Sequence, residues 1–259
     1  MIDLHTHVLP GIDDGPADLD GSLELLAAAV EEGVVTLAAT PHVRPDHPDV
    51  IPAELGPRTA ELAAAASQAG VDIELVSGGE VDLNWAQQAD DDALRAASFG
   101  GRGHDLLVET PYGELPERFE DLLFKLSVRG FRILLAHPER SRTFQRTPKR
   151  LGPIVDGGVL LQVTALSLSS TKRRSRSRKL ARELVREGLA HVIASDAHGG
   201  HIPRTGLRAG VEAAAELAPR RAQWMVTDAP AAIVGGHPLP PAPRDSGPGR
   251  GLRKRLLGG

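Results

Sequence analysis

The sequence predicts an α/β fold, in the form of a (β/α)7-type barrel. Seven short apolar runs alternate with helical patterns along most of the chain, an order typical of parallel strands covered by helices. The runs are continuously apolar, as expected for strands buried on both faces. Histidine or carboxylate residues follow six of the seven runs. A barrel gathers such residues from every strand at one end, whereas an open sheet concentrates them at one switch point, so the barrel is favoured.

The strands are predicted from runs rich in Val, Ile and Leu that are bounded by glycine, proline or charged residues. Each run is too short to form a typical globular helix by itself. The predicted strands are Ile2–His5, Val34–Thr40, Asp72–Ser77, Asp105–Glu109, Arg132–Ala136, Val159–Val163 and His191–Ser195.

Apolar residues at helical spacing predict the segments between the strands. Leu23, Leu26 and Val30 recur every three or four residues, and Gly33 follows them as a C-terminal cap. A second such pattern ends at Gly130. The predicted helices are Ser22–Glu32, Arg58–Ala69, Glu117–Arg129, Lys179–Glu187, Thr205–Leu217 and Ala229–Val234.

Bulk composition excludes several classes of function. The net charge of −4, from 30 basic and 34 acidic residues, gives no basic surplus for binding nucleic acid. The absence of cysteine excludes disulfides, zinc fingers, iron–sulfur clusters and any enzyme with a cysteine nucleophile. Apolar stretches such as Leu23–Val30 are far shorter than the roughly 20 residues that a membrane helix needs. The first strand begins at Ile2, so we expect no signal peptide and a cytoplasmic protein.

The composition changes at about His237. Residues 237–259 are rich in proline and glycine and show no apolar period. We therefore expect the folded domain to span residues 1–236 and a disordered tail to follow. The tail ends in the basic cluster Arg253-Lys254-Arg255. Such tails are commonly solvated, and the alternative is weak attraction to an anionic membrane surface or an acidic partner.

A second basic run, residues 172–179, holds six cations in eight residues and follows the sixth predicted strand. A run of this kind is usually a solvated loop or the start of a helix. Its place on the ligand-bearing side of the predicted barrel would also let it steer an anionic substrate.

Nine histidine and carboxylate residues lie at or near the ends of the predicted strands. The motif DLHTH places two imidazoles two residues apart, on one face of a strand. One such pair is a weak signal, because a lone histidine is more often a core or surface residue. Nine residues on separate segments are a stronger signal, since sites are built on loops held by a rigid scaffold. The candidate metal ligands are His5, His7, Asp14, His42, Glu80, Glu109, His137, Asp196 and His198; Gln162 marks the remaining strand.

Imidazole and carboxylate without thiolate suit Mn, Fe, Zn or Mg. Nine ligands exceed what one ion needs, so we expect two or three ions, with Glu80 and Asp196 as bridging carboxylates. Arg140 follows His137 by three residues, and Arg204 follows His198 by six. Each arginine alone could be a salt bridge at the rim, but both offer bidentate donors to phosphate. Clustered metals with two arginines indicate hydrolysis of a phosphoester.

Seven segments in order carry a resemblance to a known family: DLHTHVLPGIDDG, ATPH, GGE, LLVETPYGELP, FKLSVRGFRILLAHPER, LLQVTALSL and HVIASDAH. Together they resemble the PHP (polymerase and histidinol phosphatase) superfamily. Within it they look like the metal-dependent protein-tyrosine phosphatases of bacterial capsule and exopolysaccharide operons. The resemblance covers about residues 2–235. LHTHVLPGIDDG with HPER and SDAH is specific in combination, because a general PHP protein would share the first and last histidine motifs without LPGIDDG.

The resemblance implies a distorted (β/α)7 barrel with its active site at the C-terminal ends of the strands. It implies a trinuclear site, typically supported by Mn²⁺ and held by the nine candidate ligands. Phosphate contacts would come from Arg140 and Arg204, and Asp14 and His42 join them as candidate catalytic residues. The implied substrate is phosphotyrosine in the tail of a bacterial tyrosine autokinase that controls polysaccharide export. A phenol of pKa about 10 leaves more readily than an aliphatic alcohol, so a dedicated general acid matters less.

Two residue assignments and three rival functions stay open. Asp13 could replace Asp14 as the loop ligand, and Arg208 could replace Arg204, because the spacing after Asp196 is about one residue longer than usual. One rival is another PHP phosphoesterase, acting on histidinol phosphate or on nucleic-acid ends; aromatic content of 3% disfavours nucleic acid. A lysine-bridged amidohydrolase is disfavoured, since no lysine precedes Lys125. The third is a non-catalytic phosphate-binding regulator.

Overall fold

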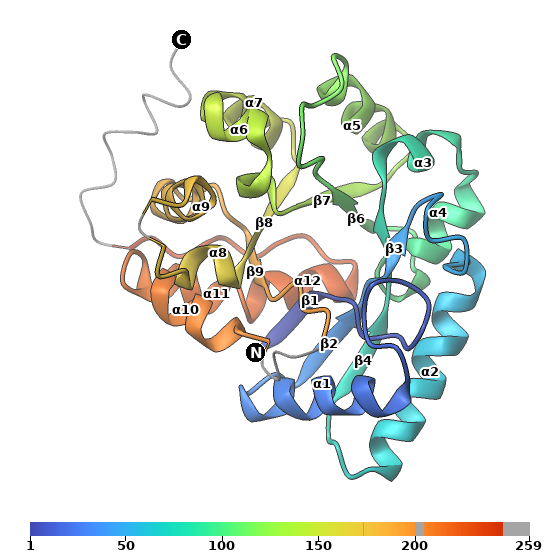
Figure 1. The fold of residues 1–259 in the computed structure, drawn as a ribbon. Helices are drawn as coiled ribbons and strands as arrows, with labels where there is room; N and C mark the ends of the chain where they lie inside the picture. Colours follow the sequence, from blue (N-terminus) through green and yellow to red (C-terminus); the bar gives the residue numbers. More distant parts are fainter. Residues whose placement is uncertain (173, 200–204, 246–259) are drawn as a thin grey trace.

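The computed structural model describes residues 1–172, 174–199 and 205–245, with helices around a set of strands (Figure 1). All ladders between its named strands are parallel, so the mixed α/β class predicted from the sequence is confirmed. The longer strands match the predicted ones to within two residues at each end. The strands of the described chain are β1 Ile2–Thr6, β2 Thr36–Ala39, β3 His42–Val43, β4 Glu74–Ser77, β5 Glu80–Val81, β6 Asp105–Glu109, β7 Arg132–Ala136, β8 Leu160–Thr164 and β9 Val192–Ala194.

The strands form two sheets, and the chain passes from the first to the second twice, after β2 and after β4. The order is β1-β2-β4 in one sheet and β3-β5-β6-β7-β8-β9 in the other. β3 and β5, which the sequence did not predict, follow β2 and β4 after two residues each. Gly79 allows the second crossing, because a Cβ there would lie 2.5 Å from the Val43 side chain. At the other side, Thr6 pairs in parallel with Ala197, just beyond β9.

A small apolar cluster lies among the strands and contains at least one residue from each of the seven longer ones. Phe99 and Ile233, from outside the strands, join the same cluster. A larger cluster packs the helices onto the outer sides of the strands. The strand residues of the small cluster include Leu4, Ala38, Val76, Leu107, Leu134, Leu160 and Val192, all at most 9% exposed.

Six helices correspond to the predicted ones, although three of them begin three to six residues earlier than expected. α1 starts three residues early because Asp18 caps it, accepting a hydrogen bond from the Gly21 amide at 3.0 Å. α2 starts six residues early, at Pro52, a residue type suited to the first turn of a helix. The six are α1 Leu19–Glu31, α2 Pro52–Gln68, α5 Phe119–Val128, α9 Arg176–Glu187, α10 Leu207–Ala215 and α12 Asp228–Gly235.

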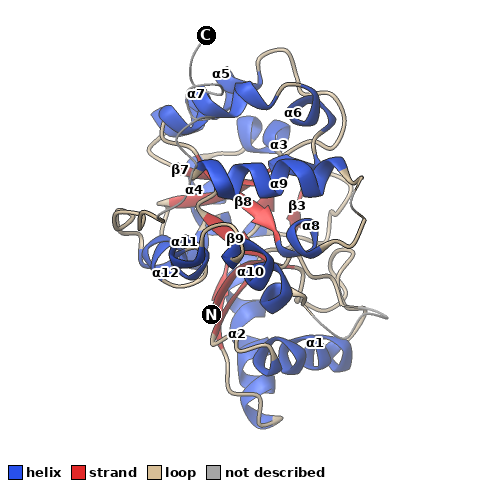
Figure 2. Cartoon of the chain, turned by 90° about the vertical axis from the view of Figure 1, so that its left-hand side faces the viewer, coloured by secondary structure: helices blue, strands red, loops and turns tan. Residues whose placement is uncertain are grey.

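The remaining helical segments are short and were not predicted. They are α3 Leu83–Gln88, α4 Asp91–Ala97, α6 Arg142–Arg146, α7 Leu151–Asp156, α8 Ala165–Ser169, α11 Pro219–Trp224, and the 3-10 turns η1 Phe99–Gly101, η2 Pro138–Arg140 and η3 Pro148–Arg150. Figure 2 shows α9 crossing in front of β8, with α8 and α10 beside it. Among the described residues, no helix combines the length and the apolar character that spanning a membrane requires.

The predicted disordered tail is packed in its first part. Residues 237–245 form no helix or strand, but Leu239 and Ala242 pack against the large apolar cluster. Asp245 accepts hydrogen bonds from the amides of Arg220 and Arg221 at 2.9 and 3.1 Å. Leu239 and Ala242 thus bury apolar surface against the folded part of the chain, and the domain boundary at residue 236 stays a prediction. The basic cluster at residues 253–255 lies outside the described residues.

Candidate metal centre

The structure brings all nine candidate ligands together at the carboxyl ends of the strands. The chain there offers four overlapping groups of side chains whose ligand atoms lie within 4.8 Å of one another. Since every group shares at least one residue with another, they form one continuous cluster rather than separate sites. The groups are His7, Asp14, His42 and His198; His5, His137 and Asp196; His5, His7 and Glu80; and His42, Glu80 and Glu109.

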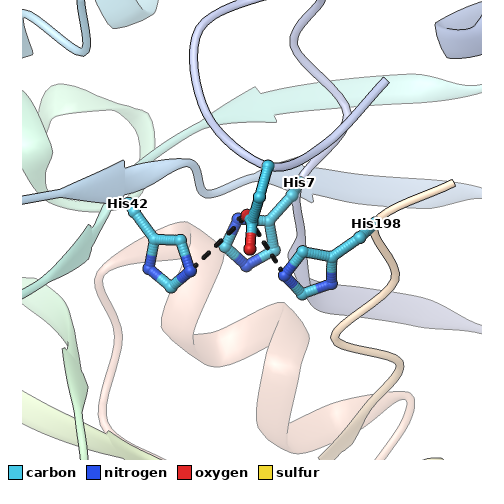
Figure 3. A group of neighbouring side chains, drawn as sticks. His7, His42 and His198 are labelled. Atoms are coloured by element: carbon cyan, nitrogen blue, oxygen red, sulfur yellow. Dashed lines mark ion pairs between the residues drawn. The ribbon is translucent and has the colours of Figure 1, made fainter. Parts of the chain in front are cut away.

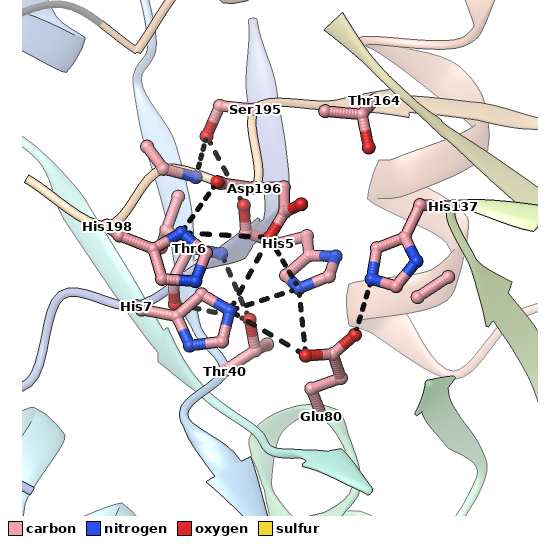
Figure 4. A network of polar contacts seen from close by, with 12 residues as sticks. His5, Thr6, His7, Thr40, Glu80, His137, Thr164, Ser195, Asp196 and His198 are labelled. Carbon is pink, nitrogen blue, oxygen red and sulfur yellow. Dashed lines mark hydrogen bonds and ion pairs between the residues drawn. The ribbon is translucent and has the colours of Figure 1, made fainter. Parts of the chain in front are cut away.

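Glu80 contacts four histidines of this cluster, and Figure 4 shows three of them, His5, His7 and His137. Its Oε2 lies 2.9 Å from His42 Nδ1, 3.5 Å from His5 Nε2 and 3.7 Å from His7 Nε2. Its Oε1 bonds His137 Nε2 at 2.8 Å. Glu80 is fully buried and belongs to two of the four groups. This geometry suits the bridging role expected for it.

Three histidines are oriented by hydrogen bonds from their Nδ1 atoms. His5 Nδ1 donates to Gln162 Oε1 at 3.1 Å, and His7 Nδ1 donates to Asp13 Oδ2 at 2.7 Å. His198 Nδ1 donates to the Asp196 carbonyl at 2.9 Å. A proton on Nδ1 leaves the Nε2 lone pair free, which is the arrangement that metal-binding histidines adopt. The Nε2 atoms of His5 and His7 lie only 3.3 Å apart, so both can face one ion.

The loop after β1 separates the roles of its two aspartates. Asp13 is buried at its side chain and also accepts the amides of Gly15 and His42, at 3.0 and 3.1 Å. Asp14 belongs to a ligand group, with Oδ1 3.4 Å from His198 Nε2 and 3.6 Å from His42 Nε2. Figure 3 shows the three histidines of that group gathered around one point. The geometry therefore favours Asp14 over Asp13 as the ligand, and Asp13 orients His7.

Two candidate ligands have a backbone conformation that costs energy. His137 and Asp196 have φ of 36° and 56°, the positive values among described non-glycine residues. Left-handed backbone at such residues is uncommon and is often found at functional sites. Both residues follow the ends of strands, β7 and β9. The sharp turn at each strand end directs the side chain into the cluster.

Arg140 lies at the rim of the cluster, in a pocket of about 270 Å³ that Asp196 and His198 also line. Its Nη1 donates to Asp196 Oδ2, and its guanidinium lies 4.7 Å from the ring centre of Tyr112. The Tyr112 ring in turn stacks on His137, with 5.3 Å between ring centres and 9° between planes. Arg140 is 37% exposed at its side chain, so it is held in place yet accessible from solvent.

The second candidate arginine, Arg204, lies outside the described residues. Its alternative, Arg208, is on α10, where its amide donates to Glu32 Oε2 at 3.0 Å and its guanidinium to the Glu31 carbonyl at 3.3 Å. These contacts tie Arg208 to the end of α1. Another arginine, Arg44, reaches the cluster instead, with Nη1 3.3 Å from Glu109 Oε2.

The cluster alternates negative and positive groups that shift one another's pKa. Burial alone would lower the pKa of His7, but hydrogen bonds to Asp13 and Asp196 and the charge of Glu80 raise it to about 10. Burial alone would raise the pKa of Glu80, yet His5 and the other histidines hold it well below its usual range. In the same way, the pKa of His5 is raised and the pKa of Asp196 is lowered. A positive charge is thus strongly favoured among these carboxylates, either as protons on the histidines of the metal-free protein or as metal ions that displace those protons from Nε2.

The donor set fits divalent metal ions. Among the described residues, Glu80 Oε2, His42 Nδ1 and His137 Nδ1 are buried without a hydrogen-bond partner. His42 Nδ1 and Glu80 Oε2 lie 2.9 Å apart but do not form a well-aligned hydrogen bond. Buried polar atoms without partners are costly unless a ligand satisfies them. Converging imidazole and carboxylate lone pairs are the chemistry of Mn, Fe and Zn sites.

Four supporting residues were not assigned these roles from the sequence: Asp13 as the partner of His7, Gln162 as a double acceptor, Arg44 and Tyr112. Gln162 Oε1 also accepts the amide of His137, at 3.2 Å. A polar residue inside the apolar run Val159–Val163 was the available signal for it. Tyr112 is the single tyrosine of the chain and stands in a proline- and glycine-containing loop, which gave no local signal of its contacts.

Comparison with known proteins identifies the family. A family model described as capsular polysaccharide synthesis, CpsB/CapC, matches residues 1–221. Tyrosine-protein phosphatase YwqE of Bacillus subtilis (strain 168) is 30% identical over 198 residues, which are 76% of this chain and 77% of that protein. Tyrosine-protein phosphatase CpsB of Streptococcus pneumoniae is 24% identical over 205 residues, 76% of this chain and 83% of that protein.

A solved structure is also similar. It comes from work on YwqE from Bacillus subtilis and CpsB from Streptococcus pneumoniae, described as unique metal-dependent tyrosine phosphatases. The TM-score is 0.83 at 26% identity, with 95% of this chain and 100% of that chain covered. The resemblance inferred from the motifs is confirmed, and this chain belongs to the CpsB/CapC family of capsular polysaccharide synthesis proteins.

Proposed function

We propose that this protein is a metal-dependent protein-tyrosine phosphatase. The observation that carries the proposal is the continuous cluster of nine histidine and carboxylate ligands with Arg140 at its rim. Relatives named tyrosine-protein phosphatases, 30% and 24% identical over three quarters of the chain, support the same reaction. Hydrolysis of a phosphate monoester needs cationic groups around the phosphoryl oxygens and an activated water, and the cluster can provide both.

The cluster would hold two or three ions, and we propose Mn²⁺ as the physiological metal, with Fe, Zn or Mg as alternatives. His5, His7, His137 and His198 would supply imidazole nitrogen, and Glu80 would supply the carboxylate between neighbouring ions. Bound divalent ions supply Lewis-acid charge and lower the pKa of water. The remaining candidate ligands are Asp14, His42, Glu109 and Asp196.

Protein side chains have distinct tasks in this proposal. Arg140 binds the phosphate through its guanidinium and neutralises the charge that develops on its oxygens. Asp196 and Tyr112 hold Arg140 in position. Asp14, with a side chain 54% exposed, is the candidate ligand most open to incoming water and phosphate, and it contacts His42. Arg204 stays a prediction as a second phosphate contact.

We infer that the seven longer strands form the distorted (β/α)7 barrel expected from the sequence. Two features support closure of the ring. The Thr6–Ala197 bridge joins the first strand to the chain after the last one, and the His7 amide donates to the Ala197 carbonyl at 2.8 Å. The small apolar cluster with residues from all seven strands has the composition of a barrel interior.

The proposed substrate is a phosphotyrosine protein, and within the family's role in capsular polysaccharide synthesis the tail of a bacterial tyrosine autokinase remains our specific candidate. Contact of the basic tail with an anionic surface and a cytoplasmic location stay predictions. The chain has no surplus of basic residues, so its charge does not suggest nucleic acid as a partner.

The test is hydrolysis of a phosphotyrosine peptide by metal-stripped protein, with and without added Mn²⁺. Phosphoserine peptide and histidinol phosphate serve as competing substrates, and metal content is measured in parallel. We expect Mn²⁺-dependent release of phosphate mainly from phosphotyrosine, and an Arg140→Ala variant that keeps its metal but has a higher KM. Activity on histidinol phosphate alone, or no activity in fully metal-loaded protein, would overturn the proposal.

A further inference from the structure

We propose that the surface between α6 and α9 binds acidic side chains next to the phosphotyrosine, so that this protein prefers acidic phosphopeptides. The inference rests on the proposed phosphatase function and names a feature of its substrate. We call the surface the α6–α9 groove and define it by Arg146, Arg176, Lys179 and Glu183. None of these residues belongs to the metal cluster or to the rim around Arg140.

The α6–α9 groove adjoins the rim of the metal cluster. It is a pocket of about 400 Å³, and the rim pocket with Arg140 measures about 270 Å³. Gln145 lines the α6–α9 groove and Ser177 lines the rim pocket. Gln145 Nε2 donates a hydrogen bond to Ser177 Oγ at 3.1 Å. The two pockets therefore share a wall. A peptide whose phosphate reaches Arg140 can place neighbouring side chains in the groove.

The groove carries an excess of positive charge. Arg176 and Lys179 are exposed and have no ion pair within 4.0 Å among the described residues. Arg146 pairs with Glu114, but the two side chains are 58% and 66% exposed, so this surface pair is weak and exchangeable. Glu183 is the acidic residue that lines the groove. Three cations against one carboxylate in a recess favour an anionic occupant.

The placement of these cations does not serve the stability of α9. The helix is capped by Ser175 and has no acidic residue in its first turn, where Arg176, Arg178 and Lys179 stand. The first turn is the positive end of the helix dipole, so cations there are unfavourable. An anionic ligand bound beside this turn would relieve the repulsion. Two cations of the basic run that was predicted to steer an anion, Arg176 and Lys179, thus line a defined recess.

A peptide fits the groove better than a membrane surface does. The charges line a recess rather than a flat face, and Leu180 and Pro148 add apolar walls that can contact side-chain carbons. Because the groove shares a wall with the rim pocket, a peptide whose phosphotyrosine occupies the active site can also contact the groove. A flat anionic surface would instead engage cations spread over a broad exposed face.

The first experiment compares two phosphotyrosine peptides of equal length, one with Asp and Glu around the phosphotyrosine and one with Asn and Gln at the same positions. Phenyl phosphate is the substrate without any flanking groups. At low ionic strength we expect kcat/KM to be about 5–10-fold higher for the acidic peptide, mainly through KM, and the ratio to fall below about 2 at high salt. Anisotropy of the labelled peptides measures binding without turnover.

The double variant R176A/K179A should lose most of this preference while hydrolysing phenyl phosphate at the normal rate. The matched control is R102A/K125A, which removes the same charge from residues that line neither pocket. The control should keep the preference. Equal loss in both variants would mean that net charge, not the groove, is responsible, and would overturn the inference.

The remaining outcomes separate the inference from the proposed function. Normal phosphotyrosine hydrolysis without acidic preference overturns the groove alone. Acidic preference in binding without any hydrolysis overturns the phosphatase and supports the groove as a peptide site. Sedimentation with phosphatidylglycerol–phosphatidylcholine vesicles tests the membrane alternative. Binding to these vesicles that R176A/K179A abolishes, with no peptide preference, would overturn the peptide assignment.

Discussion

Buried or half-buried polar groups occur at both ends of the strands, but they are satisfied in different ways. At the amino ends, Asp105 accepts hydrogen bonds from Nε and Nη2 of Arg132, and His191 Nδ1 accepts the amide of Leu161 at 3.1 Å. At the carboxyl ends, Glu80 Oε2 lies among three histidines without a hydrogen bond in the described structure.

This difference in hydrogen bonding distinguishes polar groups that stabilise the fold from polar groups that can bind a ligand. A buried group whose hydrogen bonds are all made within the protein has no lone pair or proton left for a ligand. Substituting such a group should therefore lower the stability of the fold and leave ligand binding unchanged. A buried group whose lone pairs converge without partners should lower the stability of the metal-free protein and bind cations strongly. Variants at the two ends should therefore affect different measurements.

The largest effect should follow from Glu80→Gln. The amide keeps the shape of the side chain but removes the anion that faces three histidines. We expect lower metal content and a decrease of about 10²–10³-fold in kcat/KM, the scale of losing a main electrostatic stabiliser. Metal analysis and phosphotyrosine hydrolysis measure both, and circular dichroism should show an intact fold. A variant with full metal content and activity would remove Glu80 from the centre of the site.

The matched change at the other end is Asp105→Asn. It breaks a carboxylate–guanidinium pair in which Asp105 is 1% exposed and Arg132 26% exposed at the side chains. We expect the free energy of unfolding to fall by about 2–3 kcal/mol, less than for a fully buried pair because Arg132 reaches solvent. Urea unfolding measures it. Metal content and kcat/KM should stay within about twofold of the unsubstituted protein; a large loss of either would erase the proposed contrast between the ends.

His191, at the amino ends of the strands, should make the free energy of unfolding depend on pH. Burial, together with the charge of Arg221, lowers its pKa from 6.5 to about 4. The neutral form is the one the fold accepts, so its contribution to stability is complete above pH 6.5 and is lost as pH falls toward 4. Between pH 7 and pH 5 we expect a loss of about 1–2 kcal/mol from this residue.

The control for that prediction is His191→Asn, which keeps an acceptor for the Leu161 amide without a titrating ring. Urea unfolding of metal-stripped protein at pH 7, 6 and 5 should show a shallower decline for this variant. Parallel declines in both proteins would assign the pH dependence to other groups.

The smallest effect should come from Tyr112, at the rim of the metal cluster. Tyr112→Phe keeps the ring that contacts Arg140 and stacks on His137, so it should behave like the unsubstituted protein. Tyr112→Ala removes the ring, and we expect KM for a phosphotyrosine peptide to rise about 5-fold with little change in kcat. Equal defects in the two variants would show that the hydroxyl group, rather than the stacking surface, supports Arg140.

Local patterns were sufficient to predict the longer strands and to select nine residues that the structure brings together as candidate ligands. An apolar run such as Leu106–Val108 and the carboxylate that follows it, Glu109, can be recognised without any distant contact. β3 and β5 could not be recognised, because two residues carry no periodicity and depend on partners elsewhere in the sheet. The early starts of α1 and α2 had local signals, Asp18 and Pro52, that the apolar pattern of each helix did not include.

The sequence by itself determined the element order, the chemistry of the site and the family resemblance, because these depend on residue types and short spacings. Only the tertiary structure decided which atoms meet. It favoured Asp14 over Asp13 as the loop ligand, since the fold directs Asp13 to His7 and to the His42 amide. It also joined the basic start of α9 to a recess beside Arg140. Such contacts link residues far apart in the chain, and no local pattern specifies them.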